Sequence, residues 1–499
     1  MYSLKLPDIL AGNMSRILLL VIFMVWIAWY PSLAVPILPG SAGTALFLGG
    51  YALLILGLGI WSRVTSRQIS HVNFRSSLAR FNRTIGAARI LIPVWLAVGL
   101  YLLHWHDVVE QGMGWLKNIN GVFEHVHLPE IIAGTLPAFA AWAGLWWSQY
   151  PADRALREQN LLLQLERDVP IHAPPSFWSY FTSNIRLQLL FIFAPIFVLL
   201  LARDVAAAGW YFYAHGPLPD VVELGVVGAG FIGVFVFAPA LMTRVLKTES
   251  LPPSVLRNRL EEMCRRHRLG YRDILLWHTE GNLGNAAVMG VLPGLRYVLL
   301  SDVLLETMPD EQIEAVFAHE LGHIVYKHLV WYIVFIATLL LILSGPGGSI
   351  YDYLLPRVIG NPDVHKHAVD AISSILTAGA IVLFFVLFGF VSRRFERQAD
   401  VFASRIIHEP SPAGDAPPVS PPGAALFAAA LHRVAVVNNI PIAARSWCHG
   451  SIEKRMRFLH RLAEHPDRTA EFDRVMRWLY LVLVFALVLS IVGVAWAAG

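Results

Sequence analysis

Long apolar stretches recur along the whole chain. Nine of them reach, or nearly reach, the length of about 20 apolar residues that a helix needs to cross a bilayer. Several are short for a span, so the expected number of spans is nine, give or take one or two. The stretches occupy residues 17–30, 44–61, 87–103, 131–147, 187–202, 224–242, 329–343, 372–391 and 478–498. This pattern predicts a mainly α, polytopic membrane helical bundle of about nine spans.

The first stretch has a second interpretation. Lys5 and Arg16 precede it, and residues 32–34 resemble a weak signal-peptide cleavage site. Pro31 and Pro36 flank that site and make cleavage less attractive. We therefore expect the first stretch to be a membrane anchor.

A more polar region begins after residue 242. Residues 252–268 predict an amphipathic helix, and a second helix is expected to start at 309–311 and to run on into the span at 329–343. Between these helices lie three short β-like runs, at 273–278, 286–290 and 296–301. We expect a small sheet beside a helix, an arrangement that can bind an extended peptide as an added strand.

The second of these helices carries an H-E-x-x-H motif within residues 317–328, FAHELGHIVYKH. His319 and His323 are four residues apart, so on a helix they project from one face and can bind one metal ion. Glu320 lies beside them, where it can accept a proton from an attacking water. This combination predicts a zinc hydrolase with one zinc ion per chain, because catalytic zinc keeps three protein ligands and one open position.

A third ligand is available further along the chain. Residues 392–404, SRRFERQADVFAS, place Glu396 and Asp400 four apart on one helical face. Glu396 would complete a two-His, one-Glu site, and Asp400 could fix the tautomer of a ligand imidazole. Alternatively, this is a solvated helix whose arginines pair with the two acids. The preceding H-E-L-G-H favours the metal site.

These two motifs, HELGH and S-R-x-x-E-x-x-A-D, resemble those of the integral-membrane gluzincins, which include type I CAAX prenyl endopeptidases and HtpX-type proteases. The resemblance covers roughly residues 285–462 and implies a zinc endopeptidase acting at or within the membrane. It further implies a substrate-binding edge strand at Asn285 and Ala286, although a plain structural strand remains the alternative. In WCHGSIEKRMRFL the family's His-Pro-x-x-x-x-Arg signature has glycine in place of proline. By that match His449 could donate to the oxyanion and Arg455 could support the site.

Basic residues predict the orientation of the chain. The loop between the second and third stretches contains five arginines and no acidic residue among them, so it should face the cytoplasm. Threading nine spans then puts 243–328 and 393–474, and with them both halves of the metal site, on the cytoplasmic side. The expected domains are an N-terminal membrane region of about six helices (1–242), a gluzincin domain interrupted by a membrane hairpin at 329–391 (243–475), and a C-terminal transmembrane helix (476–499).

Composition agrees with a membrane protein. The chain has 499 residues, of which 56% are hydrophobic and 15% charged, too apolar for an ordinary soluble protein. A net charge of +4 is explained by basic loops beside anionic lipid, so we expect a lipid bilayer and no nucleic acid as partner. Cys264 and Cys448 fall on the cytoplasmic side and are expected to be free thiols.

The remaining histidines are expected to have no part in the metal site. His328 is nine residues past His319, about half a helical turn out of phase, so it should face away from the metal. Three pairs with alternate spacing should be polar loop histidines rather than a second metal site: His104/His106, His125/His127 and His365/His367.

The chain is thus expected to be a membrane-embedded zinc endopeptidase that hydrolyses peptide bonds of membrane-associated or misfolded membrane proteins. Two alternatives remain open at this point. One is a prenyl-CAAX processing endopeptidase, and the other is a gluzincin-type membrane sensor or scaffold with little proteolysis. The sequence predicts no oligomeric state.

Overall fold

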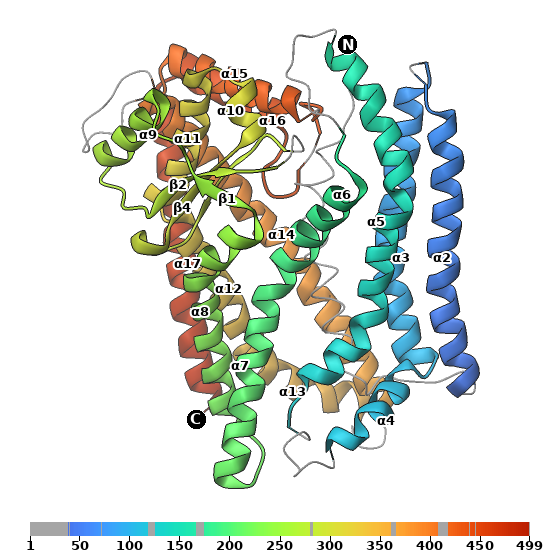
Figure 1. Cartoon of the computed structure of the whole chain (residues 1–499). Coiled ribbons are helices and arrows are strands. Elements are labelled where there is room, and N and C mark those ends of the chain that lie inside the picture. Colours follow the sequence, from blue (N-terminus) through green and yellow to red (C-terminus); the bar gives the residue numbers. More distant parts are fainter. Residues whose placement is uncertain are drawn as a thin grey trace. The chain divides into compact units, whose positions relative to one another are not determined.

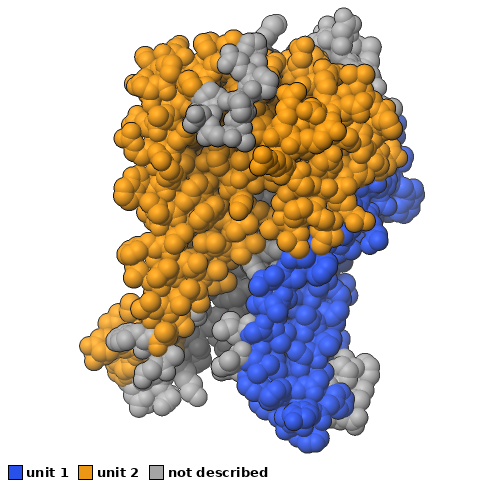
Figure 2. Space-filling view, turned by 90° about the vertical axis from the view of Figure 1, so that its left-hand side faces the viewer, with its two compact units in different colours: residues 1–248, 277–283 blue, residues 249–276, 284–499 orange. Residues whose placement is uncertain are grey.

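The structure is a computed structural model of the 499-residue chain. It describes residues 38, 40–70, 72–117, 125–165, 174–279, 283–360, 366–407, 418–438, 440–444 and 446–498. The first predicted span, at 17–30, lies outside the described residues. The chain divides into two compact units, coloured in Figure 2: residues 1–248 with 277–283, and residues 249–276 with 284–499.

The first unit is a bundle of helices. Its elements are α2 (Gly40–Gln68), α3 (Phe74–Leu102), α4 (Trp105–Lys117), α5 (Leu128–Leu165), α6 (Phe177–Asn184), the π-helical turn η3 (Ile185–Leu190), α7 (Phe191–Ala214) and α8 (Asp220–Val245). Helices α2, α3 and α5 pack together around fully buried apolar side chains, among them Phe47, Leu96 and Leu145. The loop expected around His104 and His106 contains helix α4, and these histidines lie near Asp107 (2.6 Å) and Glu110 (3.8 Å).

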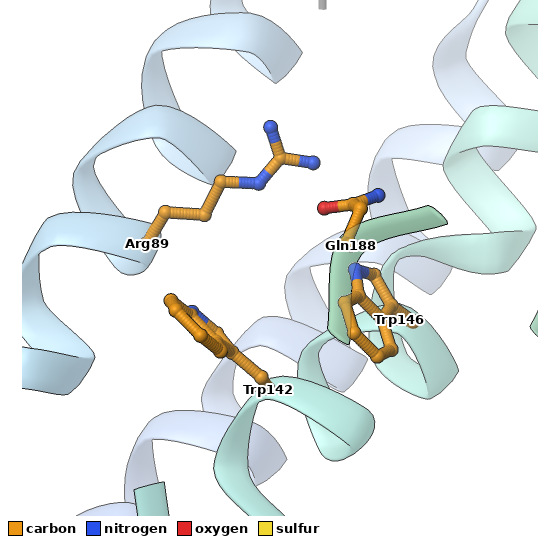
Figure 3. A pocket seen from close by; sticks show the side chains of 4 residues that line it. All are labelled: Arg89, Trp142, Trp146 and Gln188. Carbon is orange, nitrogen blue, oxygen red and sulfur yellow. The ribbon is translucent and has the colours of Figure 1, made fainter. Parts of the chain in front are cut away.

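Polar side chains also enter this bundle. Arg89 of α3, Gln188 of η3 and the indoles of Trp142 and Trp146 of α5 line a small pocket, and Figure 3 shows the guanidinium and the amide pointing toward one another. All four side chains are buried.

The second unit contains a four-stranded sheet in the order β1-β2-β4-β3. The strands are β1 (Thr248–Ser250), β2 (Asp273–Trp277), β3 (Ala286–Met289) and β4 (Tyr297–Ser301). Strand β3 therefore forms one edge, and it pairs with β4 antiparallel, with Ala286 opposite Leu300 and Val288 opposite Val298. The three β-like runs expected from the sequence are thus confirmed as β2, β3 and β4.

The second unit also contains helices, some of which pack beside the sheet while others form long apolar segments. They are α9 (Val255–Arg266), the 3₁₀ turn η4 (Pro293–Leu295), α10 (Asp302–Thr307), α11 (Asp310–Val325), α12 (His328–Ile342), the π-helical turn η5 (Leu343–Gly347), α13 (Gly348–Ile359), α14 (Lys366–Ile406), α15 (Pro421–Val437), α16 (Ile452–Glu464) and α17 (Asp467–Ala498). The predicted amphipathic helix is confirmed as α9, which starts where Ser254 Oγ accepts a hydrogen bond from Arg257 N (3.0 Å). Helices α12 and α17 run side by side (Figure 1).

The prediction of one continuous helix from the H-E-x-x-H motif into the membrane is wrong. Helix α11 ends at Val325, and α12 begins at His328. Between them Lys327 adopts a left-handed conformation with φ 54°. A non-glycine residue in that region turns the chain sharply, so the direction of every side chain after Lys327 differs from that in a straight helix.

Eight of the nine predicted spans fall in described residues, and each lies on a helix. Six helices in the described part of the chain are long and apolar enough to cross a membrane, and a seventh follows if the two bent halves of α8 form one span. The expected fold class, a mainly α membrane bundle with a smaller domain that contains some sheet, is confirmed.

Candidate functional site

Helix α11 holds the first three residues of the site. Its first turn contains Asp310 and Glu311, whose negative charges favour the N-terminus of a helix. Ile313, Phe317 and Leu321 are buried in the core on one face. Gly322 lets α14 approach closely, because a Cβ there would lie 3.0 Å from Ala399 Cα.

His319, His323 and Glu396 form one cluster. His319 Nε2 and His323 Nε2 are 3.3 Å apart. Glu396 Oε2 lies 3.6 Å from His319 Nε2, and Oε1 lies 3.6 Å from His323 Nε2. Among the described residues, these three form the one group of His, Cys, Asp or Glu side chains that could hold a metal ion.

The spacing of these donor atoms fits zinc. Tetrahedral bonds of about 2.0–2.1 Å to nitrogen and oxygen put neighbouring ligand atoms about 3.3 Å apart, close to the three separations above. Two imidazoles and one carboxylate also match the donor types of a catalytic zinc site. The residues present therefore fit a zinc ion with an open fourth position.

Asp400 and Arg455 lie behind His319. Asp400 is fully buried, and its Oδ1 is 3.0 Å from His319 Nδ1. The Arg455 guanidinium binds the same carboxylate through two hydrogen bonds of 2.8 and 2.5 Å. Burial alone would raise the pKa of Asp400, but the Arg455 charge and hydrogen bonds outweigh it and lower that pKa below its usual value. The carboxylate is therefore held as an anion, whose oxygen can accept a hydrogen bond from an N–H at His319 Nδ1. Phe427 stacks on the His319 ring (5.6 Å between centroids) and further restricts the orientation of this imidazole.

Glu320 points from α11 toward the edge strand. Its Oε2 accepts a hydrogen bond from the backbone N–H of Val288 (3.1 Å). Burial raises the pKa of Glu320 to about 7, although the neighbouring His319 opposes this shift. A carboxyl group with a pKa near neutrality can both take and return a proton at physiological pH.

His449 reaches the cluster from the C-terminal side. Its Nδ1 lies 2.8 Å from Glu396 Oε1, while its side chain is 52% exposed. Gly450 has φ +77°, a conformation that glycine adopts without strain, and it forms a two-way backbone bridge with Ser446. Trp447 anchors this turn by accepting from Arg393 Nη1 (2.8 Å) and donating to Phe385 O (2.9 Å). The glycine at the place of the family's proline therefore suits the turn that presents His449.

The arginines on α14 are engaged with other groups. Besides Arg393, Arg394 lies over the Phe390 ring (3.3 Å) and Arg397 over the Phe458 ring (5.2 Å). The two acids instead contact histidines and Arg455. This arrangement favours the metal site over the solvated helix considered from the sequence.

His328 does not face away from the cluster, and that prediction is wrong. The helix break at Lys327 returns His328 to the site, where its Nδ1 lies 2.9 Å from Nδ1 of His323. Counting helical turns from His319 fails because α11 ends before His328 is reached. The sequence carries no clear signal for the position of this break.

In the edge strand β3, the backbone N–H and C=O groups of every second residue point away from the neighbouring strand β4. Ser301 N donates to Asn285 O (3.0 Å), so the Asn285/Ser301 pair is hydrogen-bonded within the sheet. In an antiparallel pair such positions alternate. The N–H and C=O of Ala286 and Val288 therefore point away from β4, toward the open edge. The bond from Val288 N to Glu320 agrees with this direction.

Asn438 occupies the next outward position on this edge. Its side-chain amide accepts from Gly284 N (2.9 Å) and donates to Gly284 O (2.5 Å). Asn438 is buried at the end of α15 and lies 154 residues from Gly284 in sequence. No local sequence pattern could have predicted this contact.

Comparisons with known proteins agree with the geometry. Residues 254–417 match the model of peptidase family M48. A CAAX prenyl protease 1 homolog from Oryza sativa subsp. japonica is 28% identical over 181 residues, which are 33% of this chain and 39% of that protein. The methicillin resistance mecR1 protein of Staphylococcus aureus (strain Mu50 / ATCC 700699) is 32% identical over 94 residues, 18% of this chain and 16% of that protein.

The chain thus spans well under half the length of these curated relatives. Among solved structures, the crystal structure of S. mikatae Ste24p aligns with 85% of this chain and 100% of its own, at 16% identity and a TM-score of 0.46. The family match covers the H-E-x-x-H helix and the helix of Glu396 together. Over residues 254–417, which include both of these helices, the chain is thus similar to the peptidases of family M48.

Proposed function

We propose that this protein is a membrane-embedded zinc endopeptidase, with His319, His323 and Glu396 as the metal ligands. The observation that carries the proposal is the convergence of these three side chains beside Glu320 at an open sheet edge. Zinc at this position supplies Lewis-acid chemistry that activates water at neutral pH. Proton transfer and stabilisation of the oxyanion are assigned to side chains of the protein.

Glu320 is the proposed general base. It accepts the proton of the attacking water and passes it to the leaving amine, which its raised pKa allows. His449 is proposed to donate to the oxyanion that develops on the scissile carbonyl. Asp400, supported by Arg455, orients His319 through its Nδ1.

The substrate is proposed to bind β3 as an added antiparallel strand. The sequence pointed to Asn285 and Ala286 as the substrate strand. The backbone alternation supports Ala286 and Val288 as the residues that offer hydrogen bonds, whereas Asn285 bonds inward to Ser301. Asn285 then fixes the strand, and Ala286 and Val288 align the peptide with Glu320.

The preferred substrates are peptide segments of membrane-associated or misfolded membrane proteins. The curated relative named a CAAX prenyl protease supports the alternative, an endopeptidase for prenylated C-terminal peptides. Cleavage of a farnesylated CAAX peptide and its unlipidated twin distinguishes the two. Strong preference for the lipidated peptide would replace our first choice.

The proposed topology places the site at the cytoplasmic face, with about six helices before residue 243 and a membrane hairpin at 329–391. The five arginines on either side of the loop between α2 and α3, at the end of α2 and in the first part of α3, support this orientation. A cysteine introduced into that loop should react with a membrane-impermeant reagent only after the membrane is opened. Reaction in sealed cells would reverse the orientation.

A rival function is a membrane sensor or scaffold that retains the site but cleaves little. The motifs also resemble those of receptor-like membrane gluzincins, which signal after they bind a ligand. It predicts a stable complex with a partner and no cleavage of any membrane or peptide substrate. Proteolysis that depends on Glu320 would exclude it.

The deciding experiment is the variant Glu320→Gln, compared with the wild type in detergent. We expect both proteins to bind one zinc ion per chain and the variant to lose several orders of magnitude in cleavage rate, because the base is gone while the ligands remain. A wild-type protein without zinc, or a variant that cleaves as fast as the wild type, would refute the proposal.

A further inference from the structure

His328 is a buried histidine on the far side of a proposed ligand. It is 1% exposed, and its Nδ1 lies 2.9 Å from Nδ1 of His323. The Nε2 atom of His323 faces His319 and Glu396. His328 therefore contacts the one ring nitrogen of His323 that does not face the metal cluster.

The tautomers along this contact follow from the ligand geometry. If Nε2 of His323 binds a metal, its Nδ1 must carry the hydrogen and donate it, so His328 Nδ1 must accept. A neutral His328 then carries its own hydrogen on Nε2, which lies 3.0 Å from Gln398 Oε1. Each nitrogen of both rings thus has one defined role.

Gln398 and Tyr480 complete the chain of hydrogen bonds. The Tyr480 hydroxyl donates to Gln398 Oε1 at 2.5 Å, so this oxygen accepts from two donors. The carbonyl oxygen of an amide has two lone pairs and can accept both. The chain of contacts runs from α11 through α12 and α14 to α17, all within the second unit.

Ring stacking holds His328 in this orientation. Its ring lies parallel to Phe395, with 4.4 Å between centroids and 3° between planes. Tyr326 stacks on it at 5.9 Å and 20°. The helix break at Lys327 and these two rings leave the imidazole little freedom to turn away from His323.

We infer that His328 is a positioning residue that fixes the tautomer and ring orientation of His323 for metal binding. The inference rests on the proposed function. It gives the Nδ1 atoms of the two ligand histidines different neighbours: Nδ1 of His319 lies 3.0 Å from the Asp400 carboxylate, whereas Nδ1 of His323 lies 2.9 Å from the His328 imidazole. Outer partners of this kind raise metal affinity without touching the ion.

Two substitutions separate hydrogen bonding from packing. His328→Asn places an amide oxygen near the position of Nδ1 and can still accept from His323, but it loses the ring stack. His328→Phe keeps a flat ring against Phe395 and removes the acceptor. His460→Phe, an exposed histidine on α16, is the matched control.

The measurement is zinc affinity by chelator competition, together with the visible spectrum of the cobalt(II) form. We expect His328→Phe to lose about 10- to 100-fold in affinity and to shift the cobalt spectrum, whereas His328→Asn and the control stay within about threefold of the wild type. Melting temperatures of the metal-free proteins report packing damage separately.

The opposite ranking would overturn the inference. If His328→Phe binds zinc as tightly as the wild type, or His328→Asn is the weaker binder, the residue acts through packing. If the wild type itself binds no zinc, the proposed function fails instead, so the two failures are distinguishable.

Discussion

The backbone N–H of Val288 donates a hydrogen bond to the Glu320 carboxylate, over 3.1 Å. The edge of the sheet is therefore in direct contact with the proposed base. A peptide that pairs with Val288 competes for this N–H, and a carboxylate that loses one donor becomes a stronger base. Strand pairing and activation of the base are thus coupled in our proposal.

Val288→Pro tests this contact. Proline removes the N–H, which points away from β4, so the sheet should lose no ladder hydrogen bond. We expect a folded, zinc-binding protein whose kcat/KM falls about two- to tenfold, the usual worth of one hydrogen bond. Circular dichroism and peptide cleavage measure the two effects.

Ala287→Pro is the matched control, because the N–H of Ala287 points toward Leu299 within the sheet. This neighbouring substitution should destabilise the domain. Equal stability of the two proline variants would mean that the strand register is wrong.

His449→Ala should retain zinc and lose rate. Three ligands already satisfy a catalytic zinc, so removing His449 should leave the metal content unchanged. We expect kcat to fall about 10²- to 10³-fold with a near-normal KM, as for other oxyanion donors. Metal analysis and steady-state kinetics decide: loss of zinc would make His449 a ligand, and an unchanged kcat would leave it without a role.

Substitutions of the buried pair Asp400 and Arg455 should have strongly non-additive effects on the free energy of unfolding. Asp400→Asn removes the charged partner that binds Arg455 through two hydrogen bonds and leaves it only the more distant Glu396 (3.4 Å), so we expect a loss of about 3–5 kcal/mol in stability at pH 7. The folded pKa of Asp400 lies below the unfolded value of about 3.9, so its contribution is present at neutral pH and is lost as the pH falls through the folded pKa.

The double variant Asp400→Asn with Arg455→Met should recover part of that stability, because the buried guanidinium that has lost its two hydrogen bonds to Asp400 is removed. It should not recover zinc affinity, since His319 still lacks its carboxylate. Thermal melts of metal-free protein and chelator competition measure these two quantities. Full recovery of both would show that Asp400 supports only the fold.

Cys264 should react very slowly in the folded protein. Burial raises the pKa of this thiol to about 12, and the thiolate is the reactive form. In a Cys448→Ser variant, maleimide labelling at pH 8 should be about a thousandfold slower than in the same protein unfolded in detergent, and should rise about tenfold per pH unit. Fast labelling at pH 8 would show that α9 opens readily.

The sequence predicted the positions of those site residues whose spacing follows one helix. It did not predict contacts that depend on where the chain turns or on how elements distant in sequence pack together. The spacing of the H-E-x-x-H histidines and of Glu396 and Asp400 reflects helical periodicity, and the structure places all of them on helices that pack together. His328 was misjudged because a single left-handed residue, Lys327, interrupts that periodicity. The pairing of Asn438 with Gly284 depends on how α15 meets the sheet, which residue spacing does not encode.

The amide of Asn438 has a consequence for the solubility of the domain. Exposed edge strands invite other chains to extend the sheet, which leads to aggregation. At this edge, the N–H and C=O of Gly284, just before β3, are hydrogen-bonded to Asn438, and the N–H of Val288 is hydrogen-bonded to Glu320. Between these two hydrogen-bonded positions, only the short backbone segment around Ala286 offers its outward groups to another chain. A short peptide segment can bind there, but a second copy of the sheet would have to displace the side chains of Asn438 and Glu320 before it could pair along this edge.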